Sequence, residues 1–429
     1  MEKTAVTSRD FILKGDICYS KTKDALDCRE KGVLVCTAGK SAGVFSEIPA
    51  QYKHLPVADF TGKLILPGLA DLHIHAPQFA LRSLGMDLEL LDWLATFVFP
   101  EEAKYHDLDY SSQAYTALIE DLKKGPNTRS CLFATVHTPA TLKLMDLLEA
   151  SGLVCMVGKV NMDRHCPDSI REKDAETSAA ATQEWLEQCG SYKNIKPILT
   201  PRFIPSCTDD LMRRLSALQK RYHLPLQSHL SENQREIAWV QELCPKSACY
   251  GDAYSQFDLF GGEIPTIMAH CVWSEDKEIA LLAKQKVYVA HCPQSNSNLS
   301  SGAAPVRRFL EAGVPVGLGS DVAGGAHTSI FRAMTDAVQV SKLRRRLIGQ
   351  NDAPLSLEEV FYLGTLGGGS FFGPVGSFEA GYEFDALVLE DAGFAPPFKL
   401  SLRDRLERAV YLSDNSHIKA KYVRGIAIL

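Results

Sequence analysis

Residues 67–75 read PGLADLHIH, and the prediction of the fold starts from this stretch. It closes an apolar run over residues 64–75, which we predict to be a buried β-strand, and the run ends in His73 and His75. Residues i and i+2 of a strand point to the same side of its sheet. Both imidazole side chains are therefore expected to face the same way at the carboxyl end of this strand.

Seven more runs of apolar and β-branched residues follow along the chain, and helical patterns separate them. Apolar runs that alternate with helices are typical of parallel strands buried on both faces. Eight such units predict an α/β fold, a (β/α)₈ TIM barrel over residues 63–375. After the fourth run, Asp209 is expected to cap a helix that begins at Leu211. The eight runs cover residues 64–75, 130–138, 153–163, 195–203, 224–232, 266–271, 287–293 and 314–321.

Both ends of the chain carry short apolar runs separated by Gly, Ser and Lys. The runs before residue 60 are predicted to be short antiparallel strands, and residues 376–391 and 422–429 resemble them. The two ends are therefore expected to pair into one small β-sandwich domain, made of residues 1–62 and 376–429.

The composition limits the classes of function. The chain has 429 residues, of which 45% are hydrophobic and 23% charged, as is ordinary for a globular protein. A net charge of −6 argues against a dedicated nucleic-acid surface. No run approaches the roughly 18 apolar residues of a membrane-spanning helix, so we expect no membrane partner. The first residues, MEKTAVTSRDFILKGD, lack the basic and apolar regions of a secretory signal.

The cysteines indicate a reducing compartment. Twelve are present, and no CxxC pair occurs among them. Free cysteines mostly act as small buried hydrophobic residues. We expect free thiols rather than a disulfide framework or a Cys-ligated zinc site. Together with the missing signal, this favours a cytoplasmic location.

Several of the predicted strands end in residues whose nitrogen or oxygen atoms could bind a metal. Barrel enzymes place their chemistry at the carboxyl ends of the strands, where such side chains are expected to meet. Imidazole and carboxylate together suit Zn²⁺ or Fe²⁺. His137 and His291 also end runs, and we expect supporting or structural roles for them. The strongest pattern consists of five residues on the first, fifth, sixth and eighth runs: His73, His75, His229, His270 and Asp321.

These residues resemble a known family. PGLADLHIH is similar to the metal-binding signature of the amidohydrolase superfamily, and His229, His270 and Asp321 follow it in the order that this superfamily shows. The finer motifs resemble the guanine deaminases of that superfamily, from about residue 60 to residue 375. They are HAPQ at 75–78, TPRF at 200–203, SHLSEN at 228–233, MAH at 268–270, AHCPQSN at 290–296 and GLGSDVAGG at 317–325.

The resemblance implies a homodimer with one divalent metal ion per subunit, zinc or alternatively iron. His270 would contact the bound water, or bind the metal only weakly. Two-metal members of the superfamily need a carboxylated lysine late in the fourth strand. Here the only lysine of that run, Lys196, lies at the opposite end. The implied metal ligands are His73, His75, His229 and Asp321.

The same resemblance implies hydrolysis of guanine to xanthine and ammonia, a step of purine catabolism and salvage. Glu232 would act as acid and base, although its position also suits a glutamate that the dipole of a helix N-terminus favours. Asp321 and His270 would accept hydrogen bonds from the attacking water. The implied substrate contacts are His75, Gln78, Arg202, Phe203, His229, Glu232 and Asp321.

Two alternatives stay open. The same barrel could deaminate another heterocycle or displace chloride from a triazine, whereas Gln78, Arg202 and Phe203 favour guanine. Some members of the superfamily are scaffold proteins without activity, usually with ligand positions lost. Every ligand position is filled here, and metal analysis would separate an enzyme from a scaffold.

Overall fold

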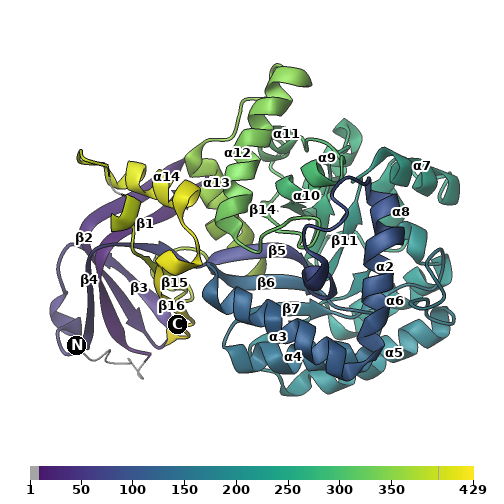
Figure 1. Cartoon of the computed structure of the whole chain (residues 1–429), viewed down its shortest axis with the longest axis horizontal. Helices are drawn as coiled ribbons and strands as arrows, with labels where there is room; N and C mark the ends of the chain where they lie inside the picture. The colour runs from purple at the N-terminus through teal and green to yellow at the C-terminus, as the bar shows by residue number, and fades with distance from the viewer. Residues whose placement is uncertain (1–8, 395) are drawn as a thin grey trace.

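The computed structural model describes residues 9–394 and 396–429 (Figure 1). Residues 1–8, which open the predicted small domain and the segment MEKTAVTSRDFILKGD, lie outside the described residues. Strands from both ends of the chain form one mixed sheet, in the order β17-β16-β15-β4-β1-β2-β3. They are β1 (Phe11–Thr22), β2 (Ala25–Thr37), β3 (Lys40–Phe45), β4 (Val57–Pro67), β15 (Ala386–Leu389), β16 (Ile418–Val423) and β17 (Ile426–Ala427).

This terminal sheet differs from the prediction in one respect. Hydrogen bonds link its seven strands into one sheet rather than the two separate sheets of a sandwich. The antiparallel pairing predicted for the first runs is confirmed, because β1 pairs with β2 and β2 with β3 in antiparallel fashion. β4 adds to β1 in parallel, with Ile12 opposite Val57. The sheet also curls, as is shown by the ring centres of Phe11 in β1 and Tyr422 in β16, which lie only 5.2 Å apart. In a flat sheet three strand spacings would separate them by roughly 14 Å, so the sheet encloses an apolar core of its own.

The middle of the chain forms two four-stranded parallel sheets, ordered β5-β6-β7-β9 and β11-β12-β13-β14. A parallel bridge between Leu199 and Leu226 joins one pair of their edges. At the other pair, the Asp321 backbone N–H donates to the His73 carbonyl over 2.8 Å. The strands are β5 (Leu69–His75), β6 (Asn127–Phe133), β7 (Val154–Gly158), β9 (Ile195–Pro197), β11 (Leu226–Leu230), β12 (Thr266–His270), β13 (Tyr288–His291) and β14 (Val316–Leu318), with β8 (Val160–Asn161) and β10 (Thr200–Pro201) forming a short extra pair.

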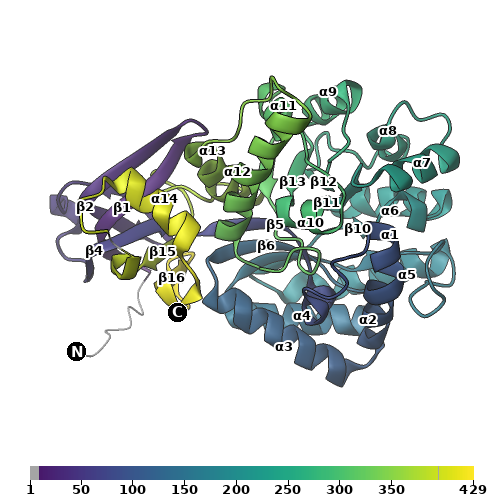
Figure 2. The ribbon, with the colours of Figure 1, turned by 45° about the horizontal axis from the view of Figure 1, so that its top comes forward.

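Helices alternate with these strands and lie outside them (Figures 1 and 2). The predicted cap of α6 is wrong by one residue. Asp209 is the first helical residue, and the Thr208 side chain accepts a hydrogen bond from the Leu211 N–H. The α-helices are α1 (Leu90–Trp93), α2 (Phe99–Ala103), α3 (Leu108–Lys124), α4 (Thr138–Ser151), α5 (Ala175–Gln188), α6 (Asp209–Tyr222), α7 (Gln234–Leu243), α8 (Tyr250–Ser255), α9 (Asp276–Gln285), α10 (Pro293–Asn298), α11 (Val306–Glu311), α12 (Ile330–Leu347), α13 (Leu357–Tyr362) and α14 (Leu402–Leu412). None of the described helices has the length and apolar character needed to span a bilayer.

The first predicted strand is divided between two sheets. β4 ends at Pro67 in the terminal sheet, and β5 begins at Leu69 in a parallel sheet. Between them lies Gly68, where an added Cβ would come within 2.3 Å of Thr128 Oγ1. A residue without a side chain is therefore needed where the chain crosses from one sheet to the other.

Arg129 of β6 connects the parallel strands to the terminal sheet. Its Nε donates to Asp385 Oδ2 over 2.5 Å, and its Nη2 donates to Glu383 Oε2 over 2.6 Å. Asp385 immediately precedes β15, and its side chain is fully buried. Because these charges are removed from water, each depends on its partner for compensation.

The Arg129→Met variant is expected to lower the free energy of unfolding by about 3–5 kcal/mol, since it leaves a buried carboxylate without its cation. Urea denaturation followed by circular dichroism measures the change. Arg213→Ala, which removes an exposed pair with Asp209, is the matched control and should cost at most about 1 kcal/mol. Equal losses in the two variants would contradict the role given to Arg129.

Candidate metal and catalytic site

Five side chains that the sequence places at strand ends lie together in the structure. Each is buried, and each belongs to the last residues of a parallel strand or to the residues directly after it. The alternation of a strand accounts for the pair in β5, since residues two apart share a face. The five are His73 and His75 of β5, His229 of β11, His270 of β12 and Asp321 after β14.

Their nitrogen and oxygen atoms converge on one small volume. His75 Nε2 and His229 Nε2 lie 3.1 Å apart. Asp321 Oδ1 lies 3.3 Å from His73 Nε2 and 3.6 Å from His75 Nε2. Ligand atoms of His73, His75 and His229 all lie within 4.8 Å of one another, and so do those of His73, His270 and Asp321.

A divalent cation fits this donor set. Neither ring nitrogen of His73 makes a hydrogen bond within the described part of the chain, although both are buried. Burial lowers the pKa of His75 and of His229 well below the usual range, which favours the neutral imidazole that binds metals. His229 Nδ1 lies 2.6 Å from the Arg202 carbonyl oxygen, so the N–H donates there and Nε2 presents its lone pair to the site.

Glu232 and His270 face each other beside this cluster, with Oε2 and Nε2 3.4 Å apart. His270 Nδ1 lies 2.9 Å from Asn296 Oδ1, an acceptor, so Nδ1 carries a proton and Nε2 points toward Glu232. Burial raises the pKa of Glu232 to about 7, against a lowering by His270. Burial opposes a charge on His270 as well, but Glu232 and Asp321 raise its pKa overall. The pair can therefore hold or release a proton near neutral pH.

Asp321 remains ionised beside these groups. Burial alone would raise the pKa of its carboxyl, but His73 and His270 hold that pKa below its usual range. An ionised carboxylate accepts hydrogen bonds and binds cations. Asp321 is therefore suited to bind a metal ion and to accept a hydrogen bond from water.

The site opens into a cavity with polar and apolar walls. Gln78, in the 3₁₀ helix η2 (Ala76–Leu81), and Arg202, which follows β10, supply buried polar groups on its lining. Such a cavity, apolar with a few placed polar groups, is typical of a site for a small molecule. Its apolar side consists of Leu90, Trp93, Leu94, Phe203 and Leu299. His137 and His291 do not line it.

Three supporting residues escaped the sequence analysis. Glu102 of α2 bonds both Gln78 and Arg202, and no motif marks it. Asn296 lies inside the quoted motif AHCPQSN, which singled out the segment but gave the asparagine no role. Ser301 donates its Oγ–H to Glu232 Oε1 over 3.2 Å from the loop after α10.

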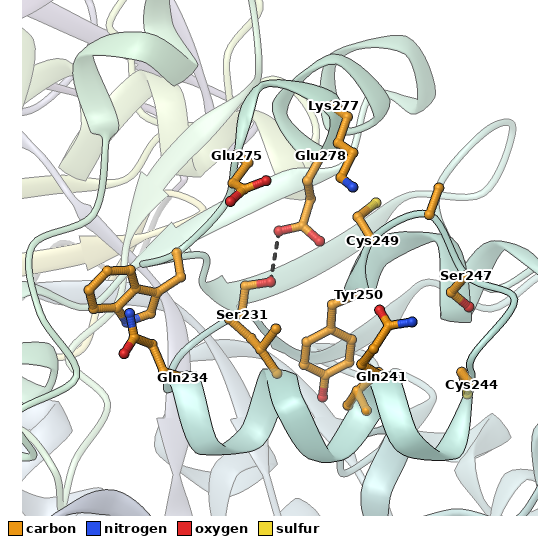
Figure 3. A pocket seen from close by; sticks show the side chains of 14 residues that line it. Ser231, Gln234, Gln241, Cys244, Ser247, Cys249, Tyr250, Glu275, Lys277 and Glu278 are labelled. Carbon is orange, nitrogen blue, oxygen red and sulfur yellow. Dashed lines mark hydrogen bonds between the residues drawn. The ribbon is translucent and has the colours of Figure 1, made fainter.

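A larger cavity of about 310 Å³ lies beside α7 (Figure 3). There Ser231 donates to Glu278 Oε2 over 2.7 Å. Tyr250, on the same lining, donates to Glu236, which also accepts the Glu232 N–H. None of the predicted metal ligands lines this cavity. The hydrogen bonds of Ser231 and Glu236 beside this cavity hold the loop that carries Glu232.

Comparison with known proteins gives consistent matches over nearly the whole chain. Residues 64–426 match the Amidohydrolase family. The chain is 38% identical over 378 residues to the guanine deaminase of Dictyostelium discoideum, covering 86% of this chain and 83% of that protein. It is 33% identical over 416 residues to the guanine deaminase of Escherichia coli K12, covering 94% and 92%.

A solved structure agrees with these matches. The guanine deaminase of C. acetobutylicum, with guanine bound in its active site, is 46% identical and superposes with a TM-score of 0.95. The match covers 98% of this chain and 100% of that one. The α/β unit thus has an amidohydrolase fold of the TIM-barrel type.

Proposed function

The chain belongs to the amidohydrolase family, and from this premise we propose that it hydrolyses guanine to xanthine and ammonia. The observation that carries the proposal is the set of three histidines and one aspartate that converge beside a cavity with polar and apolar walls. The similarity to guanine deaminases over most of the chain supports guanine as the substrate. The reaction is a step of purine catabolism and salvage.

One divalent ion is proposed at the site, zinc or alternatively iron, since imidazole and carboxylate ligands suit both. When bound, such an ion lowers the pKa of water to about 7 and so supplies a nucleophile at neutral pH. A second ion would need a lysine that reaches the site. The Nζ of Lys196 instead donates to the Tyr192 carbonyl at the surface, which supports a single ion. The proposed ligands are His73, His75, His229 and Asp321.

Glu232 is proposed to move the protons of the reaction. Its carboxylate takes a proton from the attacking water, and the resulting acid passes that proton to the purine. Glu232 then assists transfer of the remaining proton, from the new C2 hydroxyl to the amino group. The bond between C2 and this nitrogen breaks, C2 becomes a carbonyl, and the nitrogen leaves as ammonia. His270 and Asp321 accept hydrogen bonds from the water and orient it toward C2. One guanine and one water thus give one xanthine and one ammonia.

The cavity lining is proposed to recognise the edges of guanine. Phe203 supplies an aromatic face for the purine ring, and Arg202 donates to a carbonyl oxygen or a ring nitrogen. Gln78 supplies an amide, while His75, His229, Glu232 and Asp321 border the reacting carbon. A site built to bond one edge rejects analogues by large factors, because mismatched polar groups stay unpaired. Adenine is further excluded because its C2 carries no amino group.

Ammonia release from guanine, adenine and cytosine by the metal-loaded protein tests the proposal. Turnover of guanine alone is the expected result. Turnover of another heterocycle, or chloride release from a triazine, without activity on guanine would overturn the substrate. A folded protein that takes up no metal and turns over none of these compounds would be a scaffold instead.

The pH dependence of this activity follows from Glu232. Its pKa in the free protein is raised to about 7 by burial, so at lower pH the carboxyl is protonated and cannot take a proton from water. A bound divalent ion favours the carboxylate and lowers this pKa, so we expect kcat/KM for guanine to fall as the pH drops, by up to about tenfold for each pH unit below the pKa that Glu232 has in the metal-loaded protein. Steady-state assays between about pH 5 and pH 8.5 measure it. A constant kcat/KM over the acidic half of that range would contradict the assignment of Glu232 as the base.

We also propose that the parallel strands close into one (β/α)₈ barrel over residues 63–375, with residues 1–62 and 376–429 as the small domain. The bridge between Leu199 and Leu226 and the hydrogen bond from Asp321 to His73 support closure. A buried cluster with members from both parallel sheets supports it as well: Leu72, Cys131, Ile198, Ile267, Ala269, Ala290, Cys292 and Phe371.

The assembly and the location of the protein are further proposals. The similarity to guanine deaminases supports a homodimer, which sedimentation velocity would test. All twelve cysteines are free thiols, which suits a reducing compartment and supports a cytoplasmic location. Cell fractionation with an antibody against the chain would test the location.

A further inference from the structure

Glu102 holds two side chains of the proposed substrate cavity without lining that cavity itself. Its Oε1 accepts from Gln78 Nε2 over 2.9 Å, and its Oε2 accepts from Arg202 Nη1 over 2.6 Å. Gln78 and Arg202 both line the cavity. Glu102 is 3% exposed and lies in α2, on a segment that the chain inserts between β5 and α3.

The contact with Glu102 determines which way the Gln78 amide faces. An ionised carboxylate only accepts hydrogen bonds, so the amide nitrogen of Gln78 must point toward it. The Gln78 oxygen then points away from Glu102. Gln78 is therefore held so that its oxygen can accept a hydrogen bond from a bound molecule. An amide without this contact could turn over and present either its oxygen or its nitrogen.

The same carboxylate fixes the Arg202 guanidinium. Arg202 is buried, and its Cζ lies 5.2 Å from the centre of the Phe99 ring, also in α2. A buried guanidinium without a counter-charge is costly, and Glu102 provides that charge. Only one guanidinium nitrogen bonds to Glu102, so further N–H groups remain to donate to a ligand.

We propose that Glu102 is a positioning residue that selects purines with a carbonyl next to a ring N–H, as at C6 and N1 of guanine. The fixed oxygen of Gln78 can accept from the ring N–H, and the fixed N–H groups of Arg202 can donate to the carbonyl oxygen. In 2,6-diaminopurine the polarity of this edge is reversed, with an amino donor at C6 and an acceptor at N1. The inference rests on the proposed function, because it names what sets the substrate class of that site.

Glu102→Gln tests this selection with little change of size. The new amide offers both a donor and an acceptor, so the Gln78 amide is free to turn over and Arg202 loses its counter-charge. The assay compares kcat/KM for guanine and for 2,6-diaminopurine, both of which would lose the amino group at C2. We expect kcat/KM for guanine to fall about 10- to 100-fold, and the ratio of guanine to 2,6-diaminopurine to fall at least about tenfold.

The neighbouring Glu101 offers a matched control. It is buried in the same helix and pairs with Lys104 over 2.6 Å, but it bonds neither Gln78 nor Arg202. Glu101→Gln should leave the substrate ratio unchanged within about threefold. A parallel fall for both substrates in Glu102→Gln would mean a merely structural role and would overturn the inference.

A second variant keeps the inference testable if the first variant fails to fold. If thermal unfolding shows that Glu102→Gln does not fold, Glu102→Asp keeps the charge but is one methylene too short to reach both partners. The substrate ratio should fall in this variant too, and an unchanged ratio in a folded variant overturns the inference. Wild-type protein that is inactive on guanine would defeat the proposed function itself. Active wild-type protein with unchanged ratios in the variants would defeat only the role of Glu102.

Discussion

Glu232→Gln is expected to slow ammonia release from guanine by about 10²- to 10⁴-fold while the protein keeps its metal ion. Glu232 is buried, with one oxygen 3.4 Å from His270 Nε2 and the other bonded to Ser301 Oγ. The glutamine has nearly the same size and can still accept from Ser301, but it cannot take up a proton. The substitution therefore removes the group that moves protons and changes little else. Steady-state ammonia assays with metal analysis of the same samples measure the effect.

Glu278 provides the control for this variant. It too is a buried glutamate, and it accepts hydrogen bonds from Ser231 and Ser274 behind the loop of Glu232. Glu278→Gln keeps these contacts possible and should slow the reaction less than about tenfold. If the Glu232 variant kept more than a tenth of the wild-type rate with a full complement of metal, another group would have to move the protons.

The sequence was sufficient to predict the cluster of four histidines and one aspartate, because the spacing of these residues follows the geometry of a strand. His73 and His75 are two residues apart, so they share a face wherever the strand lies. His229, His270 and Asp321 end separate apolar runs, and parallel strands bring their carboxyl ends to one edge. Those runs correspond to β11, β12 and β14. The periodicity of the strands and their order along the chain were thus enough to predict this part of the site.

The remaining features depend on contacts that periodicity does not encode. Glu102 lies in a five-residue helix, and its importance comes only from packing against Gln78 and Arg202. The run over residues 64–75 is continuous in hydrophobicity, yet it divides at Gly68 because Thr128 packs there. Nor does alternation of short strands show whether they form one curled sheet or two, since that depends on which strands pair.

Removal of the metal ion with a chelator is expected to abolish ammonia release, by about 10³-fold or more, and to lower the melting temperature. The ring nitrogens of the buried His75 and His229 lie 3.1 Å apart, and Asp321 Oδ1 lies 3.3 Å from His73 Nε2. These donors are then left without the charge that would hold them together. A ligand at about a thousand times its dissociation constant adds about 4 kcal/mol to the stability of the folded state, so the loss should be visible in a thermal scan.

Adding Zn²⁺ or Fe²⁺ back to the stripped protein separates a bound ion from damage by the chelator. Recovery of rate and of melting temperature at about one ion per chain would support a single site and would show which metal serves it. Asp321→Asn should bind the ion more weakly and fail to recover, because the amide lacks the carboxylate charge. Full activity in protein shown to be metal-free would contradict the metal site. In that case the convergence of three neutral imidazoles on a buried carboxylate would need another explanation, since burying so many unpaired polar groups is costly.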